Sequence, residues 1–402
     1  MAALGSQTGR SDYSLGVDRE ILAKASALVP LLHKNAERTE LEKRVPDENV
    51  DALAAAGLWG LTRPRERGGF ETNIRTVVEV ISELGRGCGS TSWIVAVSSI
   101  IQWAISFLSE EAQTEIYELS PDPRFSATFA PTAKTERVDG GLRVTGRWGW
   151  VSGCEHAHWG FMGIPLFDEN GKAAGEGQAM LKMADCKIEK TWNAAGLVGT
   201  STHHVAAKDV FIADHMVLNV TEAARGNRTS AYPGSLYNAP FSPTECLIQG
   251  APQPGIVEAA FDHTLAYVPE KPLTYTTFAK SKDAPTVEID VARAAEKLST
   301  AKLHMAAAAD MIDLGILEGR SLSPAEHARA RMASGTISRE SREAIDHLLD
   351  ACGASVFLLS NPIQRCWRDV SVASRHGYLL NTTNAQISGA DLLGGPQIAP
   401  LL

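Results

Sequence analysis

The stretch Gly146–Trp159, "GRWGWVSGCEHAHW", has the alternation of a β-strand and carries three tryptophans. Every second residue of an extended strand points to the same side, which would place Trp148, Trp150 and Ser152 on one face. Two large aromatic side chains beside a hydroxyl suit the binding of a flat, partly polar ring system. The same pattern is typical of a tryptophan-rich barrel core, and the sequence leaves both interpretations open.

The end of the same stretch raises the question of a metal site. Cys154, His156 and His158 alternate and would share a face if the strand continued. The pair Ser152-Gly153 is expected to turn the chain, and no other cysteine, histidine or carboxylate cluster has matching spacing. We therefore expect no metal ion here.

Composition limits the function classes. The 402 residues are 44% hydrophobic, and 38 basic and 47 acidic residues give a net charge of -9, which argues against nucleic acid or an acidic membrane surface as a partner. Six irregularly spaced cysteines are typical of reduced thiols in the cytoplasm. The apolar run Trp93–Leu108 is interrupted by serines and a glutamine, so it predicts a buried helix and not a membrane span. The N-terminus does not have the pattern of a signal peptide.

The order of predicted elements is segregated, which indicates an α+β fold. Helical periodicity covers 17–120, strands cover 121–222, and helices cover 223–402. Within the last part, 225–243 is rich in glycine, proline and aromatics and predicts a long loop or lid. "SPAEH" predicts a capping box at Ser323 that begins a helix through His347. The chain has no GxGxxG or Walker loop, which argues against a nicotinamide-binding domain.

A second dense segment lies near the C-terminus. It carries Arg368, Asp369 and His376 around a predicted helix end before Gly377. At a helix C-terminus the dipole would favour protonated His376. A lone histidine in such a place is more often a cap than a catalyst.

Five segments together resemble the acyl-CoA dehydrogenase superfamily: "RVPDENVDALAAAGLWGLTRPRERGGF", "LGRGCGSTSWIVAV", "TGRWGWVSGCEHAHW", "TWNAAGLVGTSTHHVAAKDVFI" and "NPIQRCWRDVSVASRH". The likeness spans about Arg44 to Gly394. It is closest to the superfamily's oxygen-using branch, the flavin-dependent monooxygenases of two-component systems. This resemblance implies a helical N-terminal domain, a middle β-barrel and a C-terminal four-helix bundle, in a homotetramer or a homodimer.

The resemblance also implies a cofactor site for reduced FAD, or FMN, and molecular oxygen, supplied by a separate NAD(P)H:flavin reductase. Ser152 would lie near the flavin N5, and His376 would lie beside C4a, where dioxygen forms a hydroperoxide that a dry pocket protects. Further residues implied to contact the cofactor are Trp150, Ala127, Thr128, Pro131, Gly199, Thr200, Ser201 and Arg368.

Two alternatives stay open on the same scaffold. An acyl-CoA dehydrogenase needs a carboxylate base, and Glu245 falls close to the place where a minority of dehydrogenases carry one. The dehydrogenases' Arg-x-x-Phe-Gly flavin clamp is absent, which favours the monooxygenase. An N-oxygenase of an amine or amino sugar is the other alternative. A non-catalytic protein would be expected to lose Ser152 or His376, and both are present.

The substrate is expected to be a small aromatic or heteroaromatic molecule. Phenol-hydroxylating relatives carry a histidine on the helix after "GSTSW", whereas this chain has serines, Gln102 and Trp103 there. An indole, an amine or a polycyclic compound is therefore favoured. Candidate pocket residues, each of which could instead belong to the core, are Trp93, Gln102, Trp103, Trp192, Tyr232, Tyr237, Glu245 and Trp367.

Overall fold

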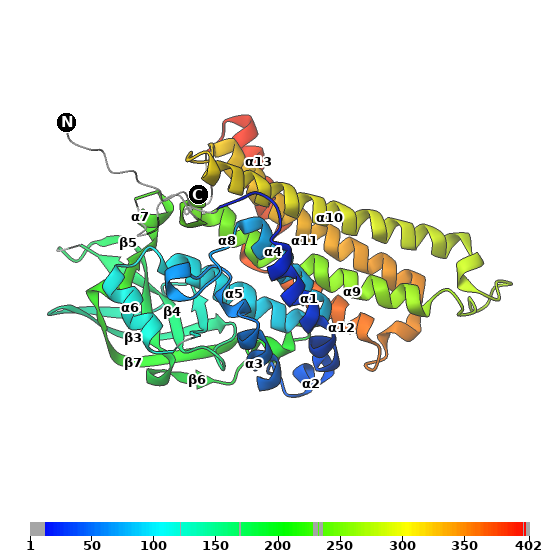
Figure 1. The fold of residues 1–402 in the computed structure, drawn as a ribbon, viewed down its shortest axis with the longest axis horizontal. Helices are drawn as coiled ribbons and strands as arrows, with labels where there is room; N and C mark the ends of the chain where they lie inside the picture. The colour runs from blue at the N-terminus through cyan, green and yellow to red at the C-terminus, as the bar shows by residue number, and fades with distance from the viewer. Residues whose placement is uncertain are drawn as a thin grey trace, which may run out of the picture.

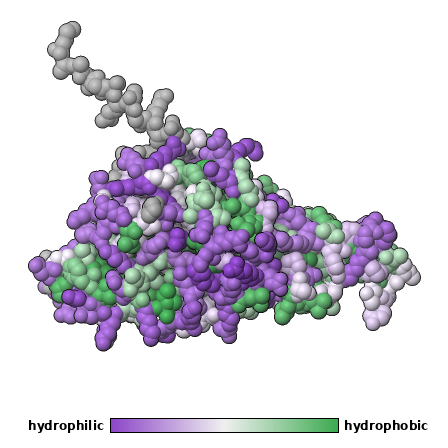
Figure 2. All heavy atoms as spheres, turned by 60° about the horizontal axis from the view of Figure 1, so that its bottom comes forward, coloured by the Kyte–Doolittle hydropathy of each residue, from purple (hydrophilic) through white to green (hydrophobic). Residues whose placement is uncertain are grey.

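A computed structural model describes residues 13–120, 122–168, 170–227, 232, 236–396 and 398. The molecule is elongated, with the strands gathered at one end and long C-terminal helices extending to the other (Figure 1). The face in Figure 2 is mostly hydrophilic, with hydrophobic residues in separate patches. In the described part of the chain, no helix combines the length and apolarity needed to cross a membrane.

Helices build the N-terminal part. They are α1 (Arg19–Lys34), α2 (Ala36–Leu41), α3 (Asp47–Ala55), α4 (Ile74–Gly87), α5 (Gly89–Ile105) and α6 (Glu110–Glu118), with 3-10 turns η1 (Leu58–Gly60) and η2 (Arg65–Arg67). The predicted buried helix is α5, in which all residues except Val97 are buried. The main hydrophobic core continues from α4 and α5 into the strands. Helix α5 is therefore the element that joins the helical part to the sheets.

Two four-stranded sheets form the middle part. Their strands are β1 (Phe125–Thr128), β2 (Lys134–Val138), β3 (Gly141–Val151), β4 (Trp159–Phe167), β5 (Ala173–Lys182), β6 (Lys187–Glu189), β7 (His203–Ala213) and β8 (Val217–Asn219). One sheet has the order β1-β4-β5-β8 and the other β2-β3-β7-β6. Strands β1 and β4 are parallel, and the other pairs are antiparallel.

A β-bulge in β3 overturns one prediction. Trp148 pairs with Val205 and Val151 pairs with His203, so two residues of β3 face one residue of β7. Trp150, inside the bulge, has a φ of 64° and is 72% exposed, whereas Trp148 is fully buried. The prediction that the two tryptophans share a face is wrong, because the bulge turns Trp150 out of the strand's alternation.

Helices return after β8. They are α7 (Val220–Ala224), α8 (Phe241–Gly250), α9 (Pro252–Tyr267), α10 (Pro285–Leu317), α11 (Pro324–Cys352), α12 (Pro362–Ala373) and α13 (Asn381–Leu393). Helices α9, α10 and α11 run side by side, and α12 packs on α9 and α11 (Figure 1). The capping box of Ser323 and Glu326 is confirmed. Short 3-10 turns complete the chain: η3 (Met183–Asp185), η4 (Val198–Thr200), η5 (Asp214–Met216), η6 (Leu236–Asn238), η7 (Ser281–Asp283), η8 (Ala354–Phe357) and η9 (Gly377–Leu379).

The predicted α+β class is confirmed. Helices end at Glu118, strands span Phe125 to Asn219, and helices resume at Val220, while the domain boundaries at 120 and 222 stay a prediction. The predicted loop at 225–243 includes the turn η6, while its residues 228–231 and 233–235 lie outside the described residues.

Candidate active site

Two cavities meet where the three parts of the chain come together. The large cavity has a volume of about 570 Å³ and the small cavity about 240 Å³. Trp93, Trp150, Ser152, His376 and Gly377 line both of them. Because these residues come from α5, from the end of β3 and from the segment after α12, the site exists only when all three parts are docked.

Ser152 sits between the cavities at the start of the turn after β3. Its Oγ accepts a hydrogen bond from Trp93 Nε1 at 3.2 Å and lies 2.9 Å from Thr202 Oγ1. Thr202 Oγ1 lies in turn 2.7 Å from Thr200 Oγ1, whose hydroxyl donates to the Leu197 carbonyl at 2.8 Å. A continuous chain of hydrogen bonds therefore runs from α5 through Ser152 to the segment before β7.

The hydrogen bond and the pKa of His376 both favour its neutral form at neutral pH. Its Nδ1 accepts the Tyr378 backbone N–H at 3.3 Å; the side chain is exposed to the cavities, and desolvation by the protein around them lowers its pKa to about 4. With Nδ1 as acceptor, the ring hydrogen lies on Nε2, for which the described residues offer no partner. The prediction that a helix C-terminus favours protonated His376 is wrong. Helix α12 ends at Ala373, and the imidazole instead caps the N-terminus of η9.

Helix α12 holds the loop that carries Thr200 and Thr202. The Asp369 carboxylate accepts the Leu197 backbone N–H at 2.6 Å, and Arg368 donates to the Ala195 carbonyl at 2.6 Å. Burial raises the pKa of Asp369 to about 6. Leu197 has a φ of 49°, which favours glycine, so these bonds stabilise a backbone shape that the residue itself disfavours.

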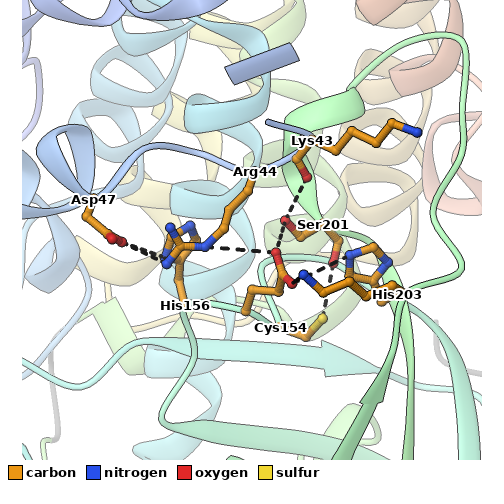
Figure 3. Close-up of polar contacts among 9 residues, drawn as sticks. Lys43, Arg44, Asp47, Cys154, His156, Ser201 and His203 are labelled. Carbon is orange, nitrogen blue, oxygen red and sulfur yellow. Dashed lines mark hydrogen bonds and ion pairs between the residues drawn. The ribbon is translucent and has the colours of Figure 1, made fainter. Parts of the chain in front are cut away.

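A second network braces the turn after Ser152 from the opposite side. Cys154 Sγ donates to the Ser201 carbonyl at 3.1 Å, and Ser201 Oγ donates to the Lys43 carbonyl at 3.1 Å (Figure 3). Glu155 pairs with Lys190 at 2.8 Å and lies within 3.2 Å of Ser201 Oγ. The turn is thereby tied to the α2–α3 connection.

The side chains considered for a metal site do not converge. His156 Nδ1 lies 3.2 Å from Arg44 Nη2, while Arg44 pairs with Asp47 (Figure 3). His158 Nδ1 accepts the Arg124 backbone N–H at 3.1 Å. Each histidine is engaged separately within the protein, because the chain turns at Ser152 as expected.

The predicted cofactor contacts divide into two groups. Those that line one or both cavities are Trp150, Ser152, Ala127, Thr128 and Thr200. Pro131 is exposed beyond β1, and Gly199 packs against α2, where a Cβ would lie 2.1 Å from a Thr39 methyl. The hydroxyl of Ser201 and the guanidinium of Arg368 are used in the contacts described above. The structure does not bring these four residues to the cavities.

The predicted substrate-pocket residues divide similarly. Trp93 lines both cavities, and Trp192 lines the large one, where its ring meets Trp150 edge-on at 5.7 Å. The residues that lie elsewhere are Gln102 (bonded to the Trp59 carbonyl), Trp103 (to Leu236), Tyr232 (to Gln113), Tyr237 (to Thr62) and Trp367 (packed on Phe357). Glu245 is buried beside the Tyr378 hydroxyl.

Sequence reasoning missed five polar residues of the site. Thr202, Ser371 and Arg375 line the large cavity, and Gln249 and Tyr378 line the small one. Helical spacing contained one signal, because Gln249 lies four residues after Glu245 on α8 and shares its face. No local pattern marks Thr202 or Tyr378.

Two family models match the chain. The description "Acyl-CoA dehydrogenase, N-terminal domain" covers residues 23–118, and "Acyl-CoA dehydrogenase, C-terminal domain" covers residues 247–380. Together they span more than half of the chain and leave out the strands.

Relatives and solved structures match over nearly the full length. The oxygenase component of an FADH2-dependent resorcinol hydroxylase from Rhizobium sp. (strain MTP-10005) is 30% identical and covers 89% of this chain and 90% of its own. The oxygenase subunit HsaA of a flavin-dependent monooxygenase from Rhodococcus jostii is 28% identical, covering 88% of this chain and 93% of its own. The structure of XiaF from Streptomyces sp. with FADH2 and glycerol has a TM-score of 0.90 at 27% identity, covering 96% of this chain and 97% of its own.

Proposed function

The chain belongs to the acyl-CoA dehydrogenase superfamily, as an oxygenase component of the flavin-dependent monooxygenase type, and we propose that it hydroxylates a small neutral aromatic or heteroaromatic molecule. Its cofactors are reduced flavin and dioxygen. When bound, the reduced flavin would supply a C4a-hydroperoxide, the oxygen donor. A separate flavin reductase would deliver the reduced flavin.

The residues around the large cavity fit a flavin ring. Trp93, Trp150 and Trp192 provide flat apolar walls, and Ser152 provides a hydroxyl at the boundary with the small cavity. Aromatic walls exclude water, which would otherwise promote loss of peroxide. The Nε2–H of His376, which lines both cavities, can donate a hydrogen bond to the oxygen that leaves or is transferred. This junction of two cavities at Ser152 and His376 is the observation that carries the proposal.

The small cavity supports the substrate class. Its walls are mainly apolar, and α5 contributes Val97, Ile100 and Ile101 instead of a base. Gln249 is only 4% exposed, and its amide nitrogen lacks a hydrogen-bond partner in the described part of the chain. The lining, taken over the described residues, includes no lysine or arginine that could bind an anionic substrate.

Tyr378 and Glu245 favour a neutral substrate that donates a hydrogen bond. Burial raises the pKa of Tyr378 well above its usual value, and the charge of Glu245 and a hydrogen bond to its carboxylate add to this. The Tyr378 hydroxyl is therefore protonated, and its oxygen can accept an O–H or N–H from the substrate. The nearby carboxylate would disfavour an anionic ring substituent, and the Arg331 charge, which lowers the pKa of Tyr378, partly offsets this effect.

The dehydrogenase alternative has less support. Glu245 is buried on α8, and it is not one of the described residues that line the two cavities. A base for an acyl chain would have to reach the reacting carbon directly. The N-oxygenase alternative shares the flavin site and differs only in the substrate.

Anaerobic stopped-flow spectroscopy tests the proposal. The protein is mixed with reduced FAD and then with oxygen, and the absorbance of a C4a-hydroperoxide is followed before oxidised flavin appears. We expect an intermediate whose decay accelerates with indole or 2-naphthol but not with 2-naphthoate. Direct reoxidation, without an intermediate, would contradict the proposal.

The variant Gln249→Leu tests whether the substrate binds in the small cavity. It should weaken 2-naphthol binding by roughly tenfold, the effect of one buried hydrogen bond. Tyr237→Phe is the matched control, because it removes a buried hydroxyl outside both cavities. Equal 2-naphthol affinity in wild type and Gln249→Leu would contradict the assignment.

The homotetramer, or homodimer, stays a prediction. Phe357, Leu358 and Leu359 form an exposed apolar segment at the end of η8, which supports a contact between subunits. Analytical ultracentrifugation of the wild type and of Leu359→Asp tests it, because the variant should shift the mass towards a smaller assembly. An unchanged mass would argue against this segment as the contact.

A further inference from the structure

We propose that Thr202 and Thr200 fix the direction of the Ser152 hydroxyl, so that Ser152 accepts a hydrogen bond from the flavin ring and thereby favours reduced over oxidised flavin. The inference rests on the proposed function and on the position of the flavin N5 near Ser152 that the family resemblance implies. It assigns a role to two threonines that would otherwise count only as cavity lining.

The direction of each hydrogen bond follows from the last acceptor in the series, the backbone carbonyl of Leu197. A backbone carbonyl can only accept, so the Thr200 hydroxyl donates its single hydrogen to Leu197 O at 2.8 Å. In the pair Thr200–Thr202, at 2.7 Å, Thr202 must then be the donor. In the pair Thr202–Ser152, at 2.9 Å, the same reasoning makes Ser152 the donor.

Trp93 completes the assignment at Ser152. An indole N–H can only donate, so Trp93 Nε1 gives its hydrogen to Ser152 Oγ at 3.2 Å. The hydrogen of Ser152 is committed to Thr202, and one of its two lone pairs is committed to Trp93. What Ser152 can offer to a ring in the cavity is therefore its second lone pair.

Further hydrogen bonds fix the position of Leu197, the last residue of the hydrogen-bond series. Leu197 O also accepts Trp192 Nε1–H at 2.9 Å, and Leu197 N–H donates to the buried Asp369 carboxylate at 2.6 Å. The side chains of Trp93, Ser152, Thr200 and Thr202 belong to residues that are all more than nine-tenths buried. Once a ring fills the large cavity that they line, water cannot easily supply another partner and reverse the direction.

The redox states of a flavin differ at N5. Reduced isoalloxazine carries a hydrogen on N5 and donates, whereas oxidised isoalloxazine has a lone pair there and accepts. A hydrogen-bond acceptor at Ser152 can bind the N5–H of the reduced ring. In the oxidised ring, the lone pair of N5 would instead face the lone pair of Ser152. Specificity by such a mismatch arises because an unpaired buried polar group is expensive.

The test measures flavin affinity without turnover. The dissociation constants of oxidised FAD and of anaerobically reduced FAD are determined for wild type and for Thr202→Val, Thr202→Ser and Ser152→Ala. Thr202→Val frees the Ser152 hydrogen to donate to oxidised N5. The ratio of the oxidised to the reduced dissociation constant should then fall by about tenfold.

Thr202→Ser retains the hydroxyl and should restore the wild-type ratio to within about twofold. Thr62→Val is the matched control, since it removes a buried hydroxyl that donates to the Ser99 carbonyl outside both cavities. It should leave the ratio unchanged. If Thr202 had a purely structural role, Thr202→Val would weaken the binding of oxidised and of reduced FAD equally, and the ratio would not change.

The outcomes test the role of the threonines separately from the placement of the flavin N5 at Ser152. An unchanged ratio in Thr202→Val with a lowered ratio in Ser152→Ala would overturn the role of the threonines alone. An unchanged ratio in both variants would put N5 away from Ser152, and would overturn the flavin placement as well. A lowered ratio in Thr202→Val that Thr202→Ser restores supports the inference.

Discussion

The charge state of His376 leads to a prediction about the pH dependence of catalysis. Desolvation by the protein around the cavities lowers its pKa from the ordinary 6.5 to about 4, although the side chain is exposed to the cavities. Lowering the assay pH from 8 to 5.5 should therefore leave its contribution to product formation nearly unchanged, because roughly 3% of the imidazole is protonated at pH 5.5. With an unshifted pKa, about 90% would be protonated, and a step that needs neutral His376 would slow by roughly tenfold.

The hydrogen-bond geometry supports the neutral form independently of desolvation. Nδ1 accepts the Tyr378 backbone N–H at 3.3 Å. A proton on Nδ1 would set two N–H groups against each other and remove this bond. The rings of Trp93 and Tyr378 pack edge-on against the imidazole, with their centroids 5.7 and 5.4 Å from its centroid. This packing restricts rotation of the imidazole away from the Tyr378 N–H.

The assay is a single turnover with reduced FAD, oxygen and excess 2-naphthol, with product measured by chromatography after quenching. The wild-type rate is divided at each pH by the rate of His376→Asn, which cancels the titration of the flavin and of other groups. We expect His376→Asn to be at least about tenfold slower, because a hydrogen bond to the reacting oxygen is weakened. A rate ratio that changes about tenfold with a midpoint near pH 6.5 would refute the reasoning.

Three further predictions concern residues around the site. Ser152→Ala should raise the fraction of oxygen released as hydrogen peroxide several-fold, measured with a peroxidase-coupled assay; unchanged coupling would contradict its role. Asp369→Ala should weaken FAD binding by about tenfold, because the Leu197 N–H loses its acceptor; an unchanged dissociation constant would show that the loop needs no such support. His156, whose pKa burial lowers to about 4, is protonated first in the unfolded chain. The contribution of His156 to the free energy of unfolding should thus be fully present above pH 6.5 and fall towards pH 4, by on the order of 2–3 kcal/mol. In urea unfolding, the free energy of His156→Gln should depend less steeply on pH than that of the wild type. The same pH dependence in both proteins would contradict this role of His156.

Local sequence signals predicted the elements well. The capping box at Ser323 and the apolar run of α5 are encoded within a few residues, so neither depends on distant contacts. The order of helices and strands follows from the same short-range periodicity. The sequence therefore predicted the fold class before any contact was known.

The details of the site depend on distant contacts. The direction of Trp150 results from a bulge that forms only when β3 pairs with β7, and the φ of Leu197 is stabilised by Asp369, 172 residues away. Gln249 and Tyr378 reach the small cavity only after α8 and η9 pack together. Ser152 and His376 were predicted because their motifs resemble a family, whereas no motif marks Thr202, whose proposed role is to set the direction of a hydrogen bond.

The backbone at Trp150 has an evolutionary consequence. A φ of 64° is unfavourable for a tryptophan by about 1 kcal/mol and nearly neutral for glycine. The indole is 72% exposed, so its burial does little to offset that energy. A lineage that no longer needed the cavity wall would be free to drift to glycine here and become more stable. The persistence of an aromatic residue at 150 among relatives would therefore mark selection for catalysis against selection for folding.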